Sequence, residues 1–271
     1  MRYNHDVDFP DLLRQHRTRG RLSQLDLALR ADTTQRHLSF IESGRSTPGR
    51  AMVLRLAESL GVSLRERNDL LLAAGYAPAY AQTSWTAPDI APVRSAINHI
   101  LAGHEPYPAV VVDRNGDIVA ANSGLALVAE DAAPDLVGIG RNAYRLALHP
   151  AGMAPRIVNF THWAQHVLNG TRHLPELHAE LRGYVPALEP NDDYLGFAVP
   201  LRLQTSLGEL HLMTTVTTFA TAIDVTLAEL RLEAFLPADA ATSDALRTAE
   251  PSLSGRGLAL APGSGHGSGN W

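Results

Sequence analysis

The sequence contains no cysteine and no lysine. Without cysteine there is no disulfide, thiolate nucleophile, iron–sulfur cluster or zinc ribbon. All 23 basic residues are arginine, so three chemistries that need an ammonium group are excluded as well. These are the Walker A phosphate loop, the Schiff-base lysine and the Ser-x-x-Lys acylase.

Long hydrophobic runs are also absent. No apolar run approaches the roughly 20 residues that span a bilayer, and the first ten residues include Asp6 and Asp8 instead of a basic segment followed by an apolar one. We therefore expect a cytoplasmic protein with no membrane partner. The chain has 271 residues, of which 45% are hydrophobic and 19% charged, which favours a globular protein of about two domains.

The charges are distributed unevenly along the chain. Residues 1–85 carry 12 arginines and 9 acidic residues, a net charge of +3, whereas the remainder carries 11 arginines and 19 acidic residues, a net charge of −8. The first part of the chain is therefore better suited to approach a polyanion.

Residues 9–75 show helical periodicity throughout. Capping residues and glycines divide this stretch into five short helices. The helix starts are indicated by Ser23, Thr34, Pro48 and the Ser63/Glu66 capping box, and the ends by Gly20, Gly44, Gly61 and Gly75. Gly20 is expected to end the first helix in a left-handed conformation.

Within this region, Ser23–Ala28, Ala31–Leu38 and Ile41–Arg45 have the spacing of a helix-turn-helix motif. The motif needs two short helices joined by a tight turn, so that the first crosses the phosphate backbone and the second lies in the major groove. The sequence resembles the DNA-binding domain of the XRE family and of the lambdoid phage repressors over residues 1–75. This resemblance implies an all-α domain whose partner is double-stranded DNA.

The resemblance also assigns roles to individual residues. It places Gln24 over a phosphate and directs five residues into the groove: Thr34, Gln35, Arg36, Ser39 and Phe40. Gln35 can pair with adenine and Arg36 with guanine, each with roughly 1–3 kcal/mol of discrimination. Phosphate contacts are expected from Arg45, Ser46 and Arg50, and a structural ion pair from Arg17 and Glu42. Because a net charge of +3 is small for a DNA-binding protein, we expect a homodimer that reads two half-sites.

Residues 76–92 contain three prolines and Trp85 and are predicted to be a linker, in which we expect coupling between the domains. An Asn115-Gly116 pair then separates two β-branched runs, 109–113 and 118–121, and predicts a hairpin with a type I′ turn. Helical patterns follow up to residue 178. Strands are predicted for 196–203, 209–219 and, after a helical turn, 230–236, which gives an α+β domain with helices over one face of the sheet.

Three strings in and before this domain are characteristic: LLLAAGYAP (70–78), HEPYPA (104–109) and VDRNGD (112–117), with Asn122 after the second strand. They resemble actinobacterial regulators that join an XRE-type domain to an MmyB-like ligand-binding domain. That sensor family is similar to PAS domains, in which an antiparallel sheet and helices enclose an apolar cavity. The resemblance implies a PAS-like domain over residues 93–240 and a small apolar, fatty-acid-like effector. Residues 241–271 are predicted to be a flexible tail.

Aromatic and aliphatic residues of the second domain are candidates for lining such a cavity, although each could equally belong to the core. They are Tyr144, Leu148, Phe160, Trp163, Val167, Phe197, Leu201, Leu212 and Phe219. His162 and His166 have the i, i+4 spacing of a metal site but lack the accompanying glutamate, and Asp192-Asp193 has no aromatic cleft to suggest a glycosidase. We therefore expect no catalytic residues, no metal and no cofactor besides the effector.

These observations predict a transcriptional regulator whose second domain senses a small molecule. The alternative is a DNA-binding regulator whose second domain is a ligand-free module for protein interaction or dimerisation. A DNA-binding enzyme is the third possibility, but the sequence offers no assembled nucleophile, base or metal set.

Overall fold

The computed structural model describes residues 8–186, 199–219 and 222–253. The chain divides into two compact units. Unit 1 comprises Met1–Ser84 together with Ala220–Ala228, and unit 2 comprises Trp85–Phe219 together with Glu229–Trp271. A short piece of the second half of the sequence therefore belongs to the first unit.

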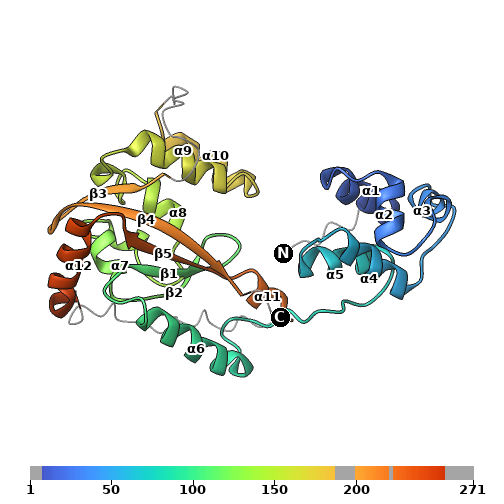
Figure 1. Cartoon of the computed structure of the whole chain (residues 1–271), viewed down its shortest axis with the longest axis horizontal. Coiled ribbons are helices and arrows are strands. Elements are labelled where there is room, and N and C mark those ends of the chain that lie inside the picture. Colours follow the sequence, from blue (N-terminus) through green and yellow to red (C-terminus); the bar gives the residue numbers. More distant parts are fainter. Residues whose placement is uncertain (1–7, 187–198, 220–221, 254–271) are drawn as a thin grey trace, which may run out of the picture. The chain divides into compact units, whose positions relative to one another are not determined.

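Unit 1 contains the five predicted helices, labelled in Figure 1: α1 (Phe9–Arg19), α2 (Gln24–Arg30), α3 (Gln35–Glu42), α4 (Arg50–Ser59) and α5 (Leu64–Ala73). Ser23 and Ser63 form capping boxes with Asp26 and Glu66, and the Thr34 hydroxyl accepts a hydrogen bond from the His37 amide. These bonds satisfy amides that a helix start leaves free. Leucines and isoleucines from all five helices form the core, among them Leu13, Leu27, Ile41, Leu56 and Leu70.

The expected left-handed end at Gly20 is wrong. Gly20 has a φ of −75°, and the next residue, Arg21, adopts the left-handed conformation with a φ of 55°. The reversal is therefore displaced by one residue, and the Leu22 amide returns to the carbonyl of Arg17 at 3.1 Å. The other three predicted helix-ending glycines, at positions 44, 61 and 75, do have positive φ.

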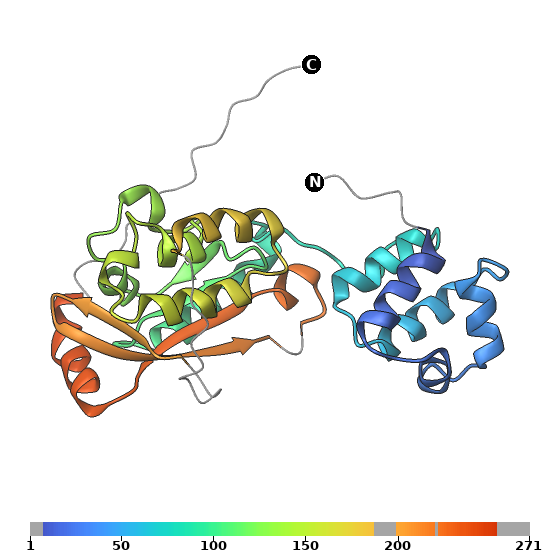
Figure 2. The ribbon, with the colours of Figure 1, turned by 90° about the horizontal axis from the view of Figure 1, so that it is seen from above.

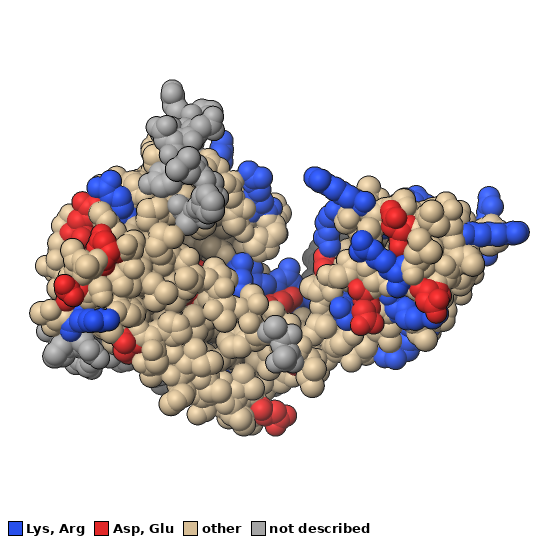
Figure 3. All heavy atoms as spheres, viewed as in Figure 1, with Lys and Arg blue, Asp and Glu red and all other residues tan. Residues whose placement is uncertain are grey.

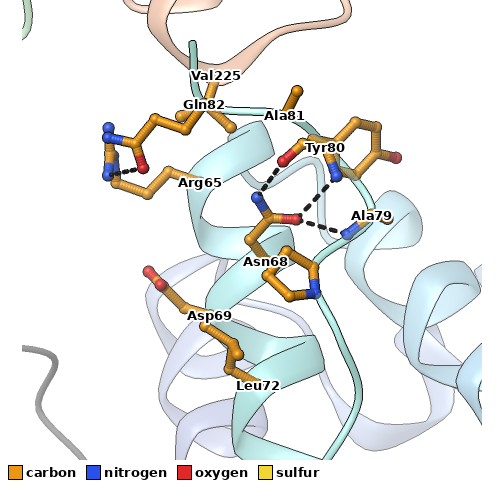
Figure 4. A pocket seen from close by; sticks show the side chains of 10 residues that line it. Arg65, Asn68, Asp69, Leu72, Ala79, Tyr80, Ala81, Gln82 and Val225 are labelled. Carbon is orange, nitrogen blue, oxygen red and sulfur yellow. Dashed lines mark hydrogen bonds between the residues drawn. The ribbon is translucent and has the colours of Figure 1, made fainter. Parts of the chain in front are cut away.

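The first half of the predicted linker is packed on unit 1. The Asn68 side chain on α5 accepts hydrogen bonds from the amides of Ala79 and Tyr80 and donates one to the Tyr80 carbonyl (Figure 4). The Tyr76 hydroxyl donates to the carbonyl of Pro48 at 3.1 Å. These side-chain bonds fix the course of the chain after α5, and the predicted linker 76–92 is ordered over this part.

Unit 2 is built on a five-stranded antiparallel sheet with the order β2-β1-β5-β4-β3. The strands are β1 (Ala109–Val112), β2 (Ile118–Ala121), β3 (Leu201–Thr205), β4 (Gly208–Thr218) and β5 (Arg231–Pro237). The helices are α6 (Ala91–Ala102), α7 (Leu125–Val128), α8 (Ala143–Leu148), α9 (Phe160–Gly170), α10 (Pro175–Tyr184) and α12 (Ala240–Leu253). Three short 3-10 helices, η1 (Pro88–Ile90), η2 (Pro134–Leu136) and η3 (Ala154–Arg156), accompany them. The predicted α+β class with a PAS-like sheet is confirmed.

At its centre the sheet is covered on both faces. The sequence analysis predicted helices over only one face. Figures 1 and 2 show α9 and α10 over one face. Val110 and Val112 of β1 join the core on this side, while Ala109 and Val111, which alternate with them, are also buried. Helix α6 contacts β2. None of the helices in the described ranges has the length and apolar character of a membrane span.

Two further predictions need correction. The hairpin exists, but Gly116 (φ 84°) alone has positive φ in its turn, because the Asp113 carboxylate accepts hydrogen bonds from the amides of Asn115 and Asp117 and holds a different turn from type I′. The flexible tail does not begin at residue 241. Helix α12 packs on β4 and β5 with Leu246 fully buried, and residues 254–271 lie outside the described ranges.

Candidate DNA-binding surface and ligand cavity

Helix α3 separates its buried and exposed residues cleanly. Leu38 and Ile41 are fully buried, whereas Thr34, Gln35 and Arg36 are accessible. Ser39 and Phe40 are partly exposed. The tight turn before α3 depends on Asp32, which has a φ of 48°, and on a hydrogen bond from the Thr33 amide to the Ala28 carbonyl. The five residues predicted to face the groove are therefore all accessible on or next to one short helix.

A buried ion pair fixes the end of α3 to α1. Arg17 Nε lies 2.6 Å from Glu42 Oε1, and Arg17 Nη2 lies 2.9 Å from Oε2, so the contact is bidentate. The Glu42 side chain is 2% exposed and that of Arg17 is 14% exposed. The hydrogen bond to Glu42 raises the pKa of Arg17. The Arg14 guanidinium also donates to the Glu42 carbonyl.

Gln24 takes part in the same network. Its side-chain nitrogen donates to Glu42 Oε2 at 2.8 Å. The sequence predicted that Gln24 lies over a phosphate, and this role stays a prediction. Because the amide nitrogen is engaged by Glu42, a phosphate contact by this side chain would have to compete with a bond to a buried carboxylate.

Phe40 has a role that the sequence did not indicate. The guanidinium carbon of Arg36 lies 5.4 Å from the centre of the Phe40 ring, and that of Arg45 lies 6.0 Å from it. These are cation–π distances. Phe40 therefore supports the arginine predicted to read a base and one predicted to contact a phosphate.

The exposed surface around α3 is cationic. Residues 33–57 contain four arginines, at positions 36, 45, 50 and 55, and one acidic residue, the buried and paired Glu42. Arg36, Arg45 and Arg50 are exposed, and Ser46 is partly exposed. Figure 3 shows basic side chains projecting from helices of this unit. The arrangement can bind phosphates around a helix that presents polar side chains to base edges.

Unit 2 contains a cavity of about 320 Å³. Its walls come from β1, β2, β4 and β5 on one side and from α7, α8 and α9 on the other. Most of the lining is apolar, including Val110, Leu125, Leu146 and Met153. A volume of this size with predominantly apolar walls is suited to a small organic ligand.

The predicted lining residues separate into three groups. Tyr144, Trp163 and Val167 line the cavity. Leu148, Leu201 and Leu212 are fully buried members of the packed core, and Phe160 packs against that core, so the interpretation of these four as lining residues has no support in the described structure. Phe219 is partly buried and does not line the cavity, and Phe197 lies outside the described residues.

Several polar residues that the sequence analysis missed line the cavity: His166, Asn169, Thr214, Arg231 and Glu233. Arg231 Nη2 donates to the Tyr144 hydroxyl at 2.7 Å. Burial lowers the pKa of His166, which favours its neutral form, and burial raises the pKa of Glu233 against the opposing influence of Arg231. Burial likewise raises the pKa of Tyr144.

His166 packs against Trp163 with a ring separation of 5.3 Å. Within the described ranges, the structure brings no three histidine or acidic side chains into a group that could hold a metal ion. Asp192 and Asp193 lie outside these ranges.

Comparison with known families assigns both units. Residues 93–249 match the model of the MmyB-like transcription regulator ligand binding domain, which covers more than half of the chain, and residues 13–67 match a helix-turn-helix model. The chain belongs to the MmyB-like family of transcription regulators. It joins an XRE-type helix-turn-helix domain to an MmyB-like ligand-binding domain, as the two sequence resemblances implied.

Other comparisons add little. No curated protein matches the chain. One solved structure, described as an RNA-binding light-oxygen-voltage receptor, is 16% identical with a TM-score of 0.25 over 93% of this chain and 60% of that chain. This MmyB-like regulator thus spans less than two thirds of that receptor, and the likeness carries no conclusion about function.

Proposed function

We propose that this MmyB-like regulator is a one-component sensor, in which a small apolar, fatty-acid-like molecule in the unit 2 cavity changes how the helix-turn-helix domain binds its operator. The main support is the cavity itself, which lies within the region matched by the ligand-binding family. The proposed sensor acts in the cytoplasm, as a homodimer on two half-sites, and performs no catalysis.

The connection between β4 and β5 offers a route for coupling. Both strands contribute residues to the cavity, including Thr214 and Glu233. The segment that joins them, which contains α11 (Val225–Ala228), belongs to unit 1 and contacts α5. The chain therefore passes from the cavity wall into the DNA-binding unit and back.

Hydrogen bonds fasten this segment to the residues that follow α5. The Asp224 carboxylate accepts from the amide and the hydroxyl of Thr83, at 3.0 and 2.6 Å, and the Val225 amide donates to the Ala81 carbonyl at 2.8 Å. Asp224 is buried and also accepts from the amide of Thr226 at the start of α11. A ligand that prefers one arrangement of β4 and β5 can bias the DNA-binding unit through these contacts, whereas one with equal affinity for two arrangements shifts nothing.

The proposal predicts that Asp224→Ala uncouples the ligand from DNA. Without ligand, the variant should bind a promoter fragment with an affinity within about twofold of the wild-type affinity, because Asp224 is outside α3. The change in DNA affinity caused by a bacterial lipid extract, a coupling of typically 1–3 kcal/mol, should largely disappear. Ile223→Ala is the matched control, since Ile223 is adjacent but 84% exposed. An unchanged lipid response in Asp224→Ala, measured by gel retardation, would contradict this route.

A second prediction concerns base reading. Arg36→Ala should weaken binding to the specific fragment by about 1–3 kcal/mol and leave binding to random duplex nearly unchanged. Arg50→Ala should weaken both alike, because it removes a phosphate contact and no base contact. Equal losses on both duplexes for Arg36→Ala would count against the assignment of this residue.

The direct test is to purify the full chain, challenge it with fragments of its own promoter region, and extract any retained small molecule for mass spectrometry. Retardation of a fragment and recovery of an apolar molecule are expected. If a fragment is retarded but no small molecule is recovered, the alternative is favoured, in which the second domain is a ligand-free interaction module. Failure to retard any fragment at modest ionic strength would overturn the proposal.

A further inference from the structure

The arginines of α1 and of the turn that follows it differ in their partners. Four arginines lie between positions 14 and 21. Three of them pair with acidic side chains: Arg14 with Asp11, Arg17 with Glu42, and Arg19 with Glu66. Arg21 is exposed, and within the ranges that the structure describes no acidic side chain pairs with it. Its guanidinium is therefore available to an anion supplied by another molecule.

The backbone of Arg21 adopts a conformation that is unfavourable for arginine. Its φ is 55°, and this left-handed conformation is strained for a residue with a Cβ. At the ends of α3, α4 and α5 the left-handed residue is a glycine, at positions 44, 61 and 75. At the end of α2 it is Asp32, a residue type that tolerates this conformation. Arginine at position 21 therefore lowers stability where glycine would not, and such strain points to a functional side chain.

The turn that carries Arg21 lies against the end of α3. The Arg17 guanidinium joins the two, because its Nη1 donates to the Leu22 carbonyl at 2.9 Å while Nε and Nη2 bind Glu42. Glu42 is the last residue of α3. The segment that follows it contains Arg45, which is predicted to contact a phosphate. Arg21 therefore lies at the end of α3 where phosphate contacts are expected.

The neighbouring polar side chains are already engaged. The Ser23 hydroxyl donates to the Asp26 carboxylate at 2.6 Å, within the capping box of α2. The Gln24 side-chain nitrogen donates to the buried carboxylate of Glu42 at 2.8 Å. A phosphate beside this turn would have to displace one of these bonds to bind Ser23 or Gln24, whereas Arg21 can bind it without such a loss.

We propose that Arg21 is a phosphate-binding residue of the DNA-binding unit, presented beside the end of α3 by the strained turn between α1 and α2. This inference rests on the proposed function and adds a contact that the sequence pattern did not indicate. The guanidinium forms charge-assisted hydrogen bonds with one DNA phosphate for each bound protomer. A phosphate contact carries no sequence information, so Arg21 raises the affinity for every duplex alike.

The experiment measures binding of the full chain to a promoter fragment and to random duplex at several salt concentrations. Arg21→Gln should weaken both by the same factor, about eightfold for each bound protomer at about 0.1 M salt. The slope of log K against log salt concentration should become shallower by about 0.9 for each protomer. Arg21→Lys keeps the charge and should keep the slope. Arg30→Gln is the matched control and should leave the slope unchanged, since Arg30 is also exposed but lies at the opposite end of α2.

Arg21→Gly separates a DNA contact from a structural role. Glycine adopts a φ of 55° without strain. This variant should therefore unfold at a higher urea concentration than the wild type, while it binds DNA as weakly as Arg21→Gln does. Weaker binding by a more stable domain cannot result from damage to its fold. Wild-type DNA affinity of Arg21→Gly would overturn the proposal.

The outcomes also separate this inference from the proposed function. If the wild type retards a fragment and Arg21→Gln has the wild-type salt slope, the phosphate contact is overturned and the proposed regulator stands. A loss confined to the promoter fragment would also overturn it, because that result is typical of a base contact. If the wild type retards no fragment, the proposed function fails and the phosphate contact fails with it.

Discussion

Replacing Glu42 with alanine is expected to lower the free energy of unfolding of unit 1 by about 3–5 kcal/mol, the usual cost of breaking a buried ion pair. Glu42 is 2% exposed and accepts from Arg17 and Gln24, so its removal leaves a largely buried guanidinium and a side-chain amide without their acceptor. Arg17 keeps one bond, to the Leu22 carbonyl at 2.9 Å. The lower end of the range is therefore expected.

The measurement is urea unfolding of the full chain, followed by hydrogen exchange of amides in α1 and α3, because the two units can unfold separately. Asp11→Ala is the matched control. It removes the Arg14–Asp11 pair, whose side chains are 50% and 68% exposed, and should cost no more than about 1 kcal/mol. Replacing both partners, as in Arg17→Met with Glu42→Leu, should recover most of the loss, because no unpaired charge remains. A loss below about 1 kcal/mol for Glu42→Ala would show that the pair contributes little.

The helices of unit 1 could be predicted because their signals are local. The Ser63/Glu66 capping box and the Thr34 cap are bonds within three residues, and the sequence displays both partners together. Helix ends at glycine are local signals as well. At the end of α1, however, the left-handed residue is Arg21 and not the predicted Gly20, so the predicted position is wrong by one residue. The order of elements in unit 2 was accessible for the same reason, since β1 and β2 are β-branched runs on either side of Asn115-Gly116 and the later strands show alternation.

The polar side of the cavity could not be predicted in this way. In β5, Leu230, Leu232 and Ala234 alternate with charged residues, and the usual interpretation is that the apolar residues face the core and the charged ones face water. The structure buries the sheet on both faces here, so Arg231 and Glu233 point into the cavity. This orientation of Arg231 and Glu233 follows only from the pairing of β5 with β1 and β4. The pairing with β1 joins residues more than 100 positions apart in the sequence.

The Phe40 platform and the Asp224 contact were missed for related reasons. Phe40 follows Arg36 by one helical turn, and the sequence showed the spacing but not that Arg45 would reach the same ring. Asp224 is separated from Thr83 by 141 residues. No local pattern indicates that the connection between two strands of unit 2 would belong to unit 1.

Gly116→Ala should destabilise unit 2 by about 2–4 kcal/mol and weaken ligand binding at the same time. Gly116 has a φ of 84°, which costs roughly 1–3 kcal/mol for a residue with a Cβ. The added Cβ would also lie 2.5 Å from Cδ2 of the Tyr144 ring, and such overpacking costs typically 1–3 kcal/mol. The two costs overlap, because a shift of Tyr144 relieves part of the second.

The shift of Tyr144 is the reason why Gly116→Ala should also weaken ligand binding. The turn is bound to the start of α8, since the Ala143 amide donates to the Gly116 carbonyl at 2.8 Å and the Asn142 side chain donates to the Asn115 carbonyl at 2.9 Å. Tyr144 therefore cannot move far without disturbing the helix that forms one cavity wall. Displacing its ring breaks the bond from Arg231 to the Tyr144 hydroxyl, and both of these residues line the cavity.

A matched control separates the backbone strain of a positive φ from the overlap of the added Cβ with the Tyr144 ring. Gly140 has a φ of 78°, and an added Cβ there would meet no atom within 4 Å, so Gly140→Ala carries the backbone cost alone. Thermal unfolding should give a smaller loss for Gly140→Ala, and the change in DNA affinity caused by the lipid extract should be unchanged. In the double variant Gly116→Ala with Tyr144→Leu, the overlap is absent, so the double loss should be smaller than the sum of the single losses. If Gly116→Ala and Gly140→Ala behave alike in stability and in their response to the lipid extract, the turn does not support Tyr144, and the wall of the cavity is held by α8 alone.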